Sequence, residues 1–278
     1  MNGRGSAAIK NRKDGNEMSS KVTWEQEGNI AIVTINNPPA NALSNVVAQQ
    51  IYECFKEIET VDDIRAVVLA GAGEKFFMAG ADISQFPELL KSRSGFVAEN
   101  TNAGHAIFNY LDYFPKPIVV AVQGMALGGG TELMMCGDLC VAAETAQFGL
   151  PEIKLGLFPG GGGTQRLPRR VGEIKAKELM FFGEFIPAAE ALRIGLINFV
   201  VPAGQALEEA KKVAAKIAGQ PAVSIRLIKE CVDRGLEVSL DEGLKIEADL
   251  FERVFRTEDV QEGVAAFLEK RKADFKHK

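Results

Sequence analysis

The chain has 278 residues, 46% hydrophobic and 25% charged, a composition typical of globular proteins. Its formal net charge of -5 and isoelectric point of about 5.4 provide no overall positive field for nucleic acid or anionic lipid. No apolar run reaches the roughly 18 residues of a membrane span, so we expect neither a nucleic acid nor a membrane partner. Four cysteines and two histidines, without metal-ligand spacing, predict buried reduced thiols and no metal site.

The first twenty residues lack the apolar core of a secretory signal and carry both basic and acidic side chains. We predict that residues 1–20 form a disordered tail and that the protein is cytoplasmic. Met18 is an alternative start, because the folded pattern begins directly after it.

The folded pattern opens with two strands in VTWEQEGNIAIVTI, joined by a turn at residues 27–29. An amphipathic helix is predicted over residues 45–59, because its apolar side chains recur on one face. RAVVLAGAG then predicts a buried strand that ends in a glycine loop.

A helical stretch is expected around residues 103–111, followed by strands in PIVVAVQG and LCVAA. From about residue 174 the pattern is mostly helical, and Ser239 with Glu242 forms a capping box. Strand patterns cease near residues 200–204. We therefore predict an α/β fold with a largely parallel sheet, in which residues 21–203 form the catalytic core and residues 204–278 a helical C-terminal region.

Three glycine-rich segments each follow an apolar, strand-like stretch: FFMAGADI (76–83), VQGMALGGGTEL (122–133) and LFPGGGGTQRL (157–167). Glycine lets the backbone approach a ligand closely and leaves N–H groups uncovered. A single glycine run is usually only a loop. Three in one chain, two of them with an apolar-flanked carboxylate, indicate a site.

Glu132 is the first of these carboxylates, and it precedes the apolar run Leu-Met-Met-Cys. In a helix its neighbours three and four residues away include no cation, so burial is expected to raise its pKa, as suits a general acid or base. The alternative is a solvated helix glutamate. Apolar neighbours argue against that alternative.

Glu152 follows 20 residues later, in FGLPEIKLGLFPG. A salt bridge to Lys154 or Arg166 is the structural alternative for it. Two carboxylates in apolar surroundings suit the addition of water to a polarised double bond, because one can deprotonate water while the other protonates carbon. For Asp82 and Asp138 we expect turn-closing roles.

A dinucleotide site is a competing interpretation of PIVVAVQGMALGG. Gly124, Ala126 and Gly129 approximate a dinucleotide-binding fingerprint, and Glu144 follows at the distance of a ribose-binding acid. However, the intervening helix would span only about seven residues, which is short for a crossover helix. Nicotinamide chemistry is therefore not expected.

Nearly all of residues 22–276 resembles the crotonase (enoyl-CoA hydratase/isomerase) family. The resemblance is carried by PPANAL, FFMAGADI, the long stretch FPKPIVVAVQGMALGGGTELMMCGDLCVAAETAQFGLPEIKLGLFPGGGGTQRLPRRVG, and EDVQEGVAAFLEKRKADF. It implies a crotonase-like spiral of ββα units with a helical C-terminal trimerisation region. It also implies a homohexamer built as a dimer of trimers.

The resemblance further implies enoyl-CoA hydratase activity, the reversible syn addition of water across the 2,3 double bond of an enoyl-CoA thioester. Backbone N–H groups of Ala81 and Gly129 would bind the thioester oxygen. Glu132 would activate water for attack at C3, and Glu152 would protonate C2. No cofactor is implied beyond the coenzyme A of the substrate.

The coenzyme A surface implied by the resemblance includes Ala40, Ala42, Ala79, Asp82 and Ile83. Phe267 and Lys270 match residues that in relatives reach coenzyme A from a neighbouring subunit.

The sequence departs from the family pattern at two positions. Thr131 stands where a cysteine is frequent, and Gly161 stands where an alanine is common. Another lyase or isomerase, such as a hydroxyacyl-CoA or carnitinyl-CoA dehydratase or an enoyl-CoA isomerase, remains an alternative. A non-catalytic acyl-CoA-binding protein would typically lack one glutamate.

Overall fold

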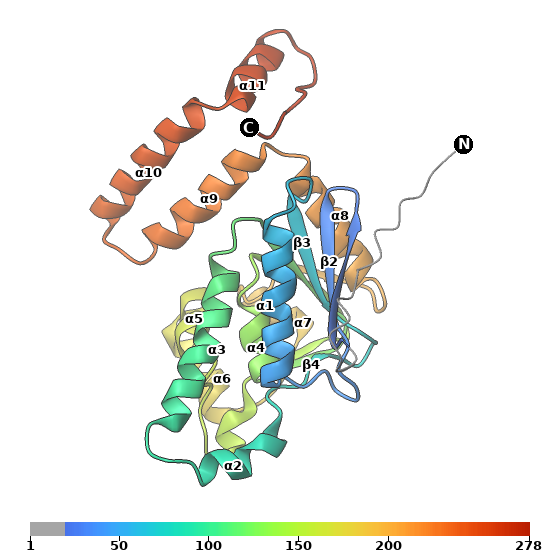
Figure 1. The fold of residues 1–278 in the computed structure, drawn as a ribbon, viewed down its shortest axis with the longest axis vertical. Helices are drawn as coiled ribbons and strands as arrows, with labels where there is room; N and C mark the ends of the chain where they lie inside the picture. Colours follow the sequence, from blue (N-terminus) through green and yellow to red (C-terminus); the bar gives the residue numbers. More distant parts are fainter. Residues whose placement is uncertain (1–19) are drawn as a thin grey trace, which may run out of the picture.

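The computed structural model describes residues 20–278 (Figure 1). The tail predicted for residues 1–20, apart from Ser20, and the alternative start at Met18 lie outside this range. The principal sheet has six strands in the spatial order β1(Val22–Glu27), β2(Ile30–Ile35), β3(Ala66–Gly71), β5(Ile118–Val122), β7(Leu139–Ala143) and β10(Phe199–Val201). All neighbours are parallel except β1 and β2, which form the predicted hairpin around Gly28.

The central strands of this sheet are buried on both faces, which explains their continuous apolar sequences. In β5, Ile118, Val120 and Val122 belong to one hydrophobic cluster, whereas Val119 and Ala121 belong to another. Helix α8(Ala206–Ala218) covers the second face with Ala210, Ala214 and Ala218. These residues repeat every four positions, so a stripe of small side chains lets the helix approach the strands closely.

A second, four-stranded sheet contains β4(Phe76–Met78), β6(Met125–Leu127), β8(Gln147–Gly149) and β9(Ile186–Pro187). The first three strands pair in parallel, and each follows a strand of the principal sheet. Neither β4 nor β6 was predicted as a strand, because both lie in segments that were identified only as glycine-rich. Each contributes three residues, which is too few for a recognisable alternation.

The helices that accompany these strands lie mainly on the face opposite α8 (Figure 1). Helix α1(Asn45–Glu59) has the predicted bounds, and α3(Phe96–Asp112) is longer than the expected stretch. The remaining short elements are η1(Ile83–Gln85), α2(Phe86–Leu90), α4(Gly129–Met134), η2(Pro151–Leu155), α5(Gly163–Val171), α6(Glu173–Phe182) and α7(Ala188–Arg193). Together with the strands, they form successive ββα units.

The turn after β5 excludes the dinucleotide interpretation. At Gly124 the chain passes directly into β6 and not into a crossover helix, and α4 has only six residues. A methyl group on Gly124 would lie 2.2 Å from the carbonyl oxygen of Lys75. Gly124 is therefore required for the close contact between two chain segments, not for a pyrophosphate.

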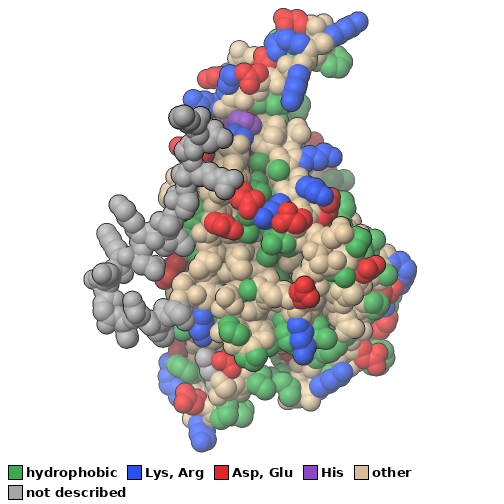
Figure 2. Space-filling view, turned by 90° about the vertical axis from the view of Figure 1, so that its right-hand side faces the viewer, with side chains coloured by type: hydrophobic (Ala, Val, Ile, Leu, Met, Phe, Trp, Pro, Cys, Tyr) green, Lys and Arg blue, Asp and Glu red, His purple; other side chains and the backbone are tan. Residues whose placement is uncertain are grey.

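The C-terminal arm comprises α9(Ala222–Gly235), α10(Leu240–Phe255) and α11(Glu258–Leu268), and it projects from the core (Figures 1 and 2). Of the predicted capping box of α10 the serine half is present, since the Ser239 hydroxyl accepts a hydrogen bond from the Glu242 N–H at 3.3 Å, whereas the Glu242 carboxylate accepts from Lys245. Residues 204–278 contain only helices after β10, and the division of the chain at residue 204 stays a prediction. Within this region α8 packs on the principal sheet, and the projecting arm begins at α9. Among the helices described, none is both long and apolar enough to span a bilayer.

Candidate active site

The backbone around Ala81 is held in place by the segment at residues 40–43. Ala79 N–H donates to the carbonyl of Ala40 at 3.0 Å, and Leu43 N–H donates to the carbonyl of Gly80 at 2.8 Å. Asp82 N–H returns to the carbonyl of Leu43, also at 2.8 Å. This parallel bridge uses the groups on either side of Ala81 and leaves the Ala81 N–H free of it.

Gly129 lies directly opposite Ala81, although the two are 48 positions apart (129 − 81). A methyl group on Gly129 would be 3.6 Å from the Ala81 nitrogen. Gly129 is the first residue of α4, where a helical N–H has no partner within its helix. Within the described chain, neither N–H donates a hydrogen bond to another protein group. The two donors are therefore available to a single acceptor oxygen.

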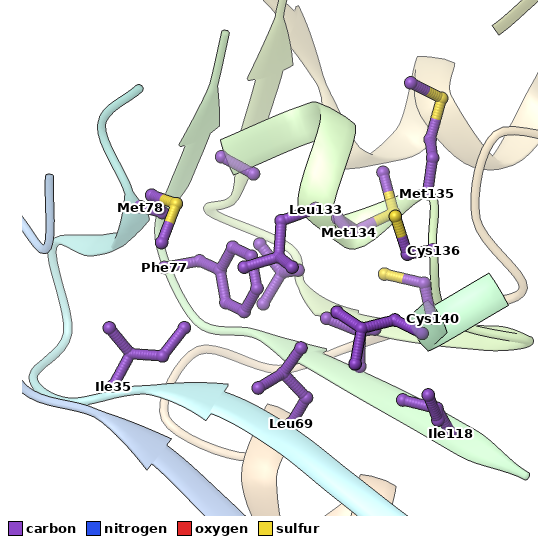
Figure 3. Packing of buried hydrophobic residues seen from close by; sticks show 14 of the residues in the cluster. Ile35, Leu69, Phe77, Met78, Ile118, Leu133, Met134, Met135, Cys136 and Cys140 are labelled. Carbon is purple, nitrogen blue, oxygen red and sulfur yellow. The ribbon is translucent and has the colours of Figure 1, made fainter. Parts of the chain in front are cut away.

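Helix α4 lies close against β4 and β6. A methyl group on Gly130 would lie 2.2 Å from the Met78 carbonyl oxygen, so glycine is required there. The Thr131 Oγ1 lies 2.6 Å from the carbonyl oxygen of Ala126 and 2.9 Å from that of Gly149, so its one proton is shared between these two acceptors. Leu133 packs beside Phe77 between α4 and the sheets (Figure 3). Threonine, which replaces the family's frequent cysteine, thus anchors the helix to two strands.

Glu132 is confirmed as a buried residue, with 4% of its surface exposed. Its Oε1 accepts hydrogen bonds from the N–H groups of Gly161 at 2.8 Å and Gly163 at 2.7 Å. Burial raises the pKa of Glu132, and the two N–H groups and the positive charge of Arg166 oppose that rise. The carboxyl group is therefore held in one orientation while its proton affinity stays above that of a solvated glutamate.

Glu152 lies in η2, and its carboxyl group lies next to Gly128, the residue that precedes α4. Its Oε1 would be 2.9 Å from a methyl group on Gly128, and its Oε2 is buried without a hydrogen-bond partner in the described chain. Burial raises the pKa of Glu152 to about 7, and the negative charge of Glu132 adds to the rise. A carboxyl group with this pKa exchanges protons readily near neutral pH.

The salt-bridge alternative for Glu152 is wrong. Arg166 pairs instead with Asp112, and Lys154 lies over the Phe185 ring at 5.5 Å from its centre. Two carboxyl groups, of which Glu132 raises the pKa of Glu152 by its charge, and two free N–H donors thus surround one glycine-framed region. Such an arrangement can transfer protons to and from a substrate whose oxygen accumulates negative charge.

The remaining predicted residues occupy varied positions. Ala40, Ala42 and Ala79 are partly exposed along the bridge that supports Ala81, and Ile83 is 58% exposed beside it. Asp82 accepts hydrogen bonds from the N–H and hydroxyl groups of Ser84, which confirms its turn-closing role. Asp138 accepts from the Ile118 N–H and from Lys229.

Phe267 and Lys270 are not brought to this region within one chain. Phe267 is 83% exposed on α11, and Lys270 follows the end of that helix. Figure 1 shows α11 in the arm, away from α4 and β4. Their contact with coenzyme A across a subunit boundary remains a prediction.

Sequence reasoning missed two residues behind Glu132. His105 Nε2 lies 2.6 Å from the Gly160 carbonyl oxygen, and Arg166 Nη1 donates to the Gly161 carbonyl at 3.0 Å. The rarity of histidine in this chain was the available signal for His105. Among residues 20–278, no three His, Cys, Asp or Glu side chains are grouped so that they could hold a metal ion.

Comparison with known proteins agrees with this geometry. Residues 25–278 match the family model described as enoyl-CoA hydratase/isomerase. The chain is 42% identical over 258 residues to the short-chain-enoyl-CoA hydratase of Clostridium acetobutylicum, covering 92% of this chain and 97% of the relative. It is 41% identical over 256 residues to the crotonyl-CoA hydratase of Syntrophomonas wolfei, covering 91% and 97%.

Solved structures extend the likeness to the fold. The enoyl-CoA hydratase from Bacillus anthracis superimposes with a TM-score of 0.87 at 37% identity, covering 93% of this chain and 100% of that one. The predicted ββα fold with its parallel sheet is confirmed by this neighbour. The chain therefore belongs to the enoyl-CoA hydratase/isomerase family.

Proposed function

We propose that the protein is an enoyl-CoA hydratase, a hydro-lyase that adds water reversibly, with syn stereochemistry, to the 2,3 double bond of an enoyl-CoA thioester. The observation that carries this proposal is the pairing of two carboxyl groups with raised pKa values, the buried Glu132 and the partly buried Glu152, beside two unengaged N–H donors. The names of the relatives from Clostridium acetobutylicum and Syntrophomonas wolfei support the same reaction.

In the proposed mechanism, ionised Glu132 removes a proton from water while the water oxygen bonds to C3. The electron pair of the double bond moves to the thioester oxygen, which the N–H groups of Ala81 and Gly129 stabilise. Protonated Glu152 then gives its proton to C2, and the carbonyl re-forms. Glu132 ends protonated and Glu152 ionised, which is the state required for the reverse dehydration.

Hydration uses both Glu132 and Glu152, whereas isomerisation of a double bond needs only one carboxyl group. The presence of both therefore favours hydration over the isomerase alternative. The bridge of Ala40, Ala42 and Ala79, with Asp82 and Ile83, is the proposed coenzyme A surface. Phe267 and Lys270 are proposed to complete it from a neighbouring subunit.

Purified protein is expected to hydrate crotonyl-CoA without added metal or nicotinamide, because carboxyl and backbone groups supply all the proposed chemistry. The loss of the enoyl thioester's ultraviolet absorbance measures the rate, before and after exhaustive treatment with a chelator. Activity that appears only when a metal ion or a nicotinamide cofactor is added would refute cofactor-independent hydration.

The pH dependence of kcat/KM is expected to be bell-shaped, because both directions need one proton on the carboxyl pair. Above a pH of about 7 the pair loses this proton, since the pKa of Glu152 is about 7, and activity then falls about tenfold per pH unit. Initial rates of crotonyl-CoA hydration from about pH 5 to about pH 10 measure the profile. An alkaline limb that is absent from the wild-type profile would contradict the role of protonated Glu152.

A homohexamer, assembled as a dimer of trimers, is the proposed oligomer. Its support is the exposure of large apolar side chains on the arm, which a lone chain would leave in water: Ile228, Val232, Leu236, Leu240, Leu244, Phe251, Phe255, Val264, Phe267 and Leu268. Figure 2 shows the arm as a protrusion above the core, with much of its surface open. Sedimentation at micromolar concentration should give a hexamer, and a 30.0 kDa species would exclude it.

A cytoplasmic location is also proposed. The four cysteines are free in the structure, and three of them are buried. Unpaired thiols suit a reducing compartment, where structural disulfides are rare.

A further inference from the structure

The loop at residues 160–163 carries the N–H groups that hold Glu132, yet it has no side chains with which to fix itself. Gly162 has a φ of +103°, and a methyl group there would lie 1.9 Å from Arg166 Nη1. Four consecutive glycines have high conformational freedom in the absence of outside contacts. The position of the two N–H donors must therefore be set by neighbouring elements.

Helix α3 provides those contacts on one of its faces. His105, Asn109 and Asp112 follow one another at spacings of four and three residues, so they share a face of the helix. Asn109 Oδ1 accepts from Arg166 Nη2 at 2.8 Å, and Asp112 Oδ2 accepts from Arg166 Nε at 2.8 Å. Only 14% of the Arg166 side chain is exposed. Hydrogen bonds to α3 therefore fix the Arg166 side chain in the position from which it contacts the loop.

Two loop carbonyls are gripped by this assembly. Arg166 Nη1 donates to the carbonyl of Gly161 at 3.0 Å, and His105 Nε2 lies 2.6 Å from the carbonyl oxygen of Gly160. A carbonyl oxygen can only accept, so His105 carries a proton on Nε2.

The peptide group between Gly160 and Gly161 consequently has partners at both ends. Its oxygen accepts from His105, and its N–H donates to Glu132 Oε1 at 2.8 Å. Linked hydrogen bonds polarise and strengthen one another. His105 of α3 is thus connected to the Glu132 carboxylate through the peptide group between Gly160 and Gly161. The hydrogen bond from Arg166 to the Gly161 carbonyl orients the next peptide group, between Gly161 and Gly162.

We propose that His105 and Arg166 are positioning residues for the Glu132 carboxylate, which act by clamping the carbonyls of Gly160 and Gly161. The proposal rests on the proposed role of Glu132 as the base that activates water. Neither side chain needs to touch the substrate. Their effect is to keep the N–H group of Gly161 aimed at Oε1 and to fix the backbone that leads to Gly163, the second donor, so that the carboxylate is ionised and correctly oriented when water binds.

The charged groups that act on the pKa of Glu132 are Arg166 on α5 and His105 on α3, and Glu132 in turn raises the pKa of Glu152 on η2. Replacement of Arg166 removes both a charge and a clamp, whereas replacement of His105 separates the two effects. His105→Gln keeps an N–H donor of similar reach without an ionisable ring, and His105→Ala removes the donor.

Asn102→Ala, exposed on α3, is the matched control for His105→Ala. Arg169→Met on α5, which touches neither glycine carbonyl, is the control for Arg166→Met.

His105→Ala and Arg166→Met are each expected to lower kcat for crotonyl-CoA about 10- to 100-fold, the effect of weakening a hydrogen bond to a charged group. KM should change by no more than about twofold, because the groups act on the base and not on substrate binding. The acidic limb of kcat/KM should move to higher pH, since a carboxylate with poorer N–H donors holds its proton more tightly. His105→Gln should restore both the rate and the limb.

A merely structural role would reduce the fraction of active enzyme and leave the limb in place. The proposal is overturned if His105→Ala and Arg166→Met match their controls in kcat and in the acidic limb, or if His105→Gln is as slow as His105→Ala. Infrared titration of protein with ¹³C-labelled glutamate, with Glu132→Gln as the reference, reports the Glu132 carboxylate directly. That titration tests the clamp even if the wild-type protein fails to hydrate crotonyl-CoA, a failure that would refute the proposed function alone.

Discussion

Replacing either Glu132 or Glu152 by Gln is expected to lower kcat for hydration of crotonyl-CoA by at least about 100-fold. General acid or base catalysis contributes on the order of 10²–10⁴-fold, and glutamine keeps the size of the side chain while losing the proton transfer. KM should change little, because the thioester oxygen is bound by the N–H groups of Ala81 and Gly129. Steady-state kinetics on folded, oligomeric variants measure both quantities.

The double variant is expected to fall well short of the product of the two single losses, since groups that act on one reaction as a unit are not additive. Glu144→Gln is the matched control, because Glu144 is an exposed glutamate of the same core and has no role in the proposed chemistry. An isomerase would leave one of the two acids nearly dispensable. A folded Glu152→Gln protein that hydrates crotonyl-CoA at the wild-type rate would defeat the mechanism.

Gly130→Ala is expected to reduce kcat/KM by about 10²–10³-fold, the usual effect of losing one donor to a developing oxyanion. The added methyl group would lie 2.2 Å from the carbonyl oxygen of Met78, which is backbone and cannot rotate away. Helix α4 must therefore move from β4, and it carries Gly129 away from Ala81. Overpacking of this kind also lowers the free energy of unfolding by about 1–3 kcal/mol.

Gly104→Ala provides the control for this substitution. Gly104 lies inside α3, and no atom lies within 4 Å of the position that its methyl group would take. The variant should keep its activity and gain up to about 1 kcal/mol from better helix propensity. Thermal unfolding and kinetics of both variants are measured together. Wild-type kcat/KM in Gly130→Ala would mean that the spacing of α4 and β4 does not set the donor geometry.

Local sequence alone predicted those parts of the fold whose burial leaves a periodic trace. The hairpin of β1 and β2, helix α1 and the apolar strands β3, β5 and β7 all carry continuous or alternating apolar residues. The burial of Glu132 was also predictable, because the residues that follow it in the same helix are apolar. Such signals lie within a few neighbouring residues, where side-chain chemistry reports directly on contact with water.

The short strands β4, β6 and β8 could not be recognised in this way. Each has three residues, and its identity as a strand depends on hydrogen bonds to partners dozens of positions away. Helix α8 was likewise assigned to the C-terminal region, because its amphipathic pattern shows that one face is buried but not against which element.

The site itself belongs mostly to this second kind of information. The glycines indicated that the backbone comes close to something, and the two glutamates indicated acid–base chemistry. Only the packing of α4 against β4 brings the N–H groups of Ala81 and Gly129 together. Only the docking of α3 places His105 behind the loop that holds Glu132 and fixes the Arg166 side chain of α5 there. Residue type and periodicity are local properties of the sequence, whereas the distance between two backbone groups is set by the register and packing of whole elements.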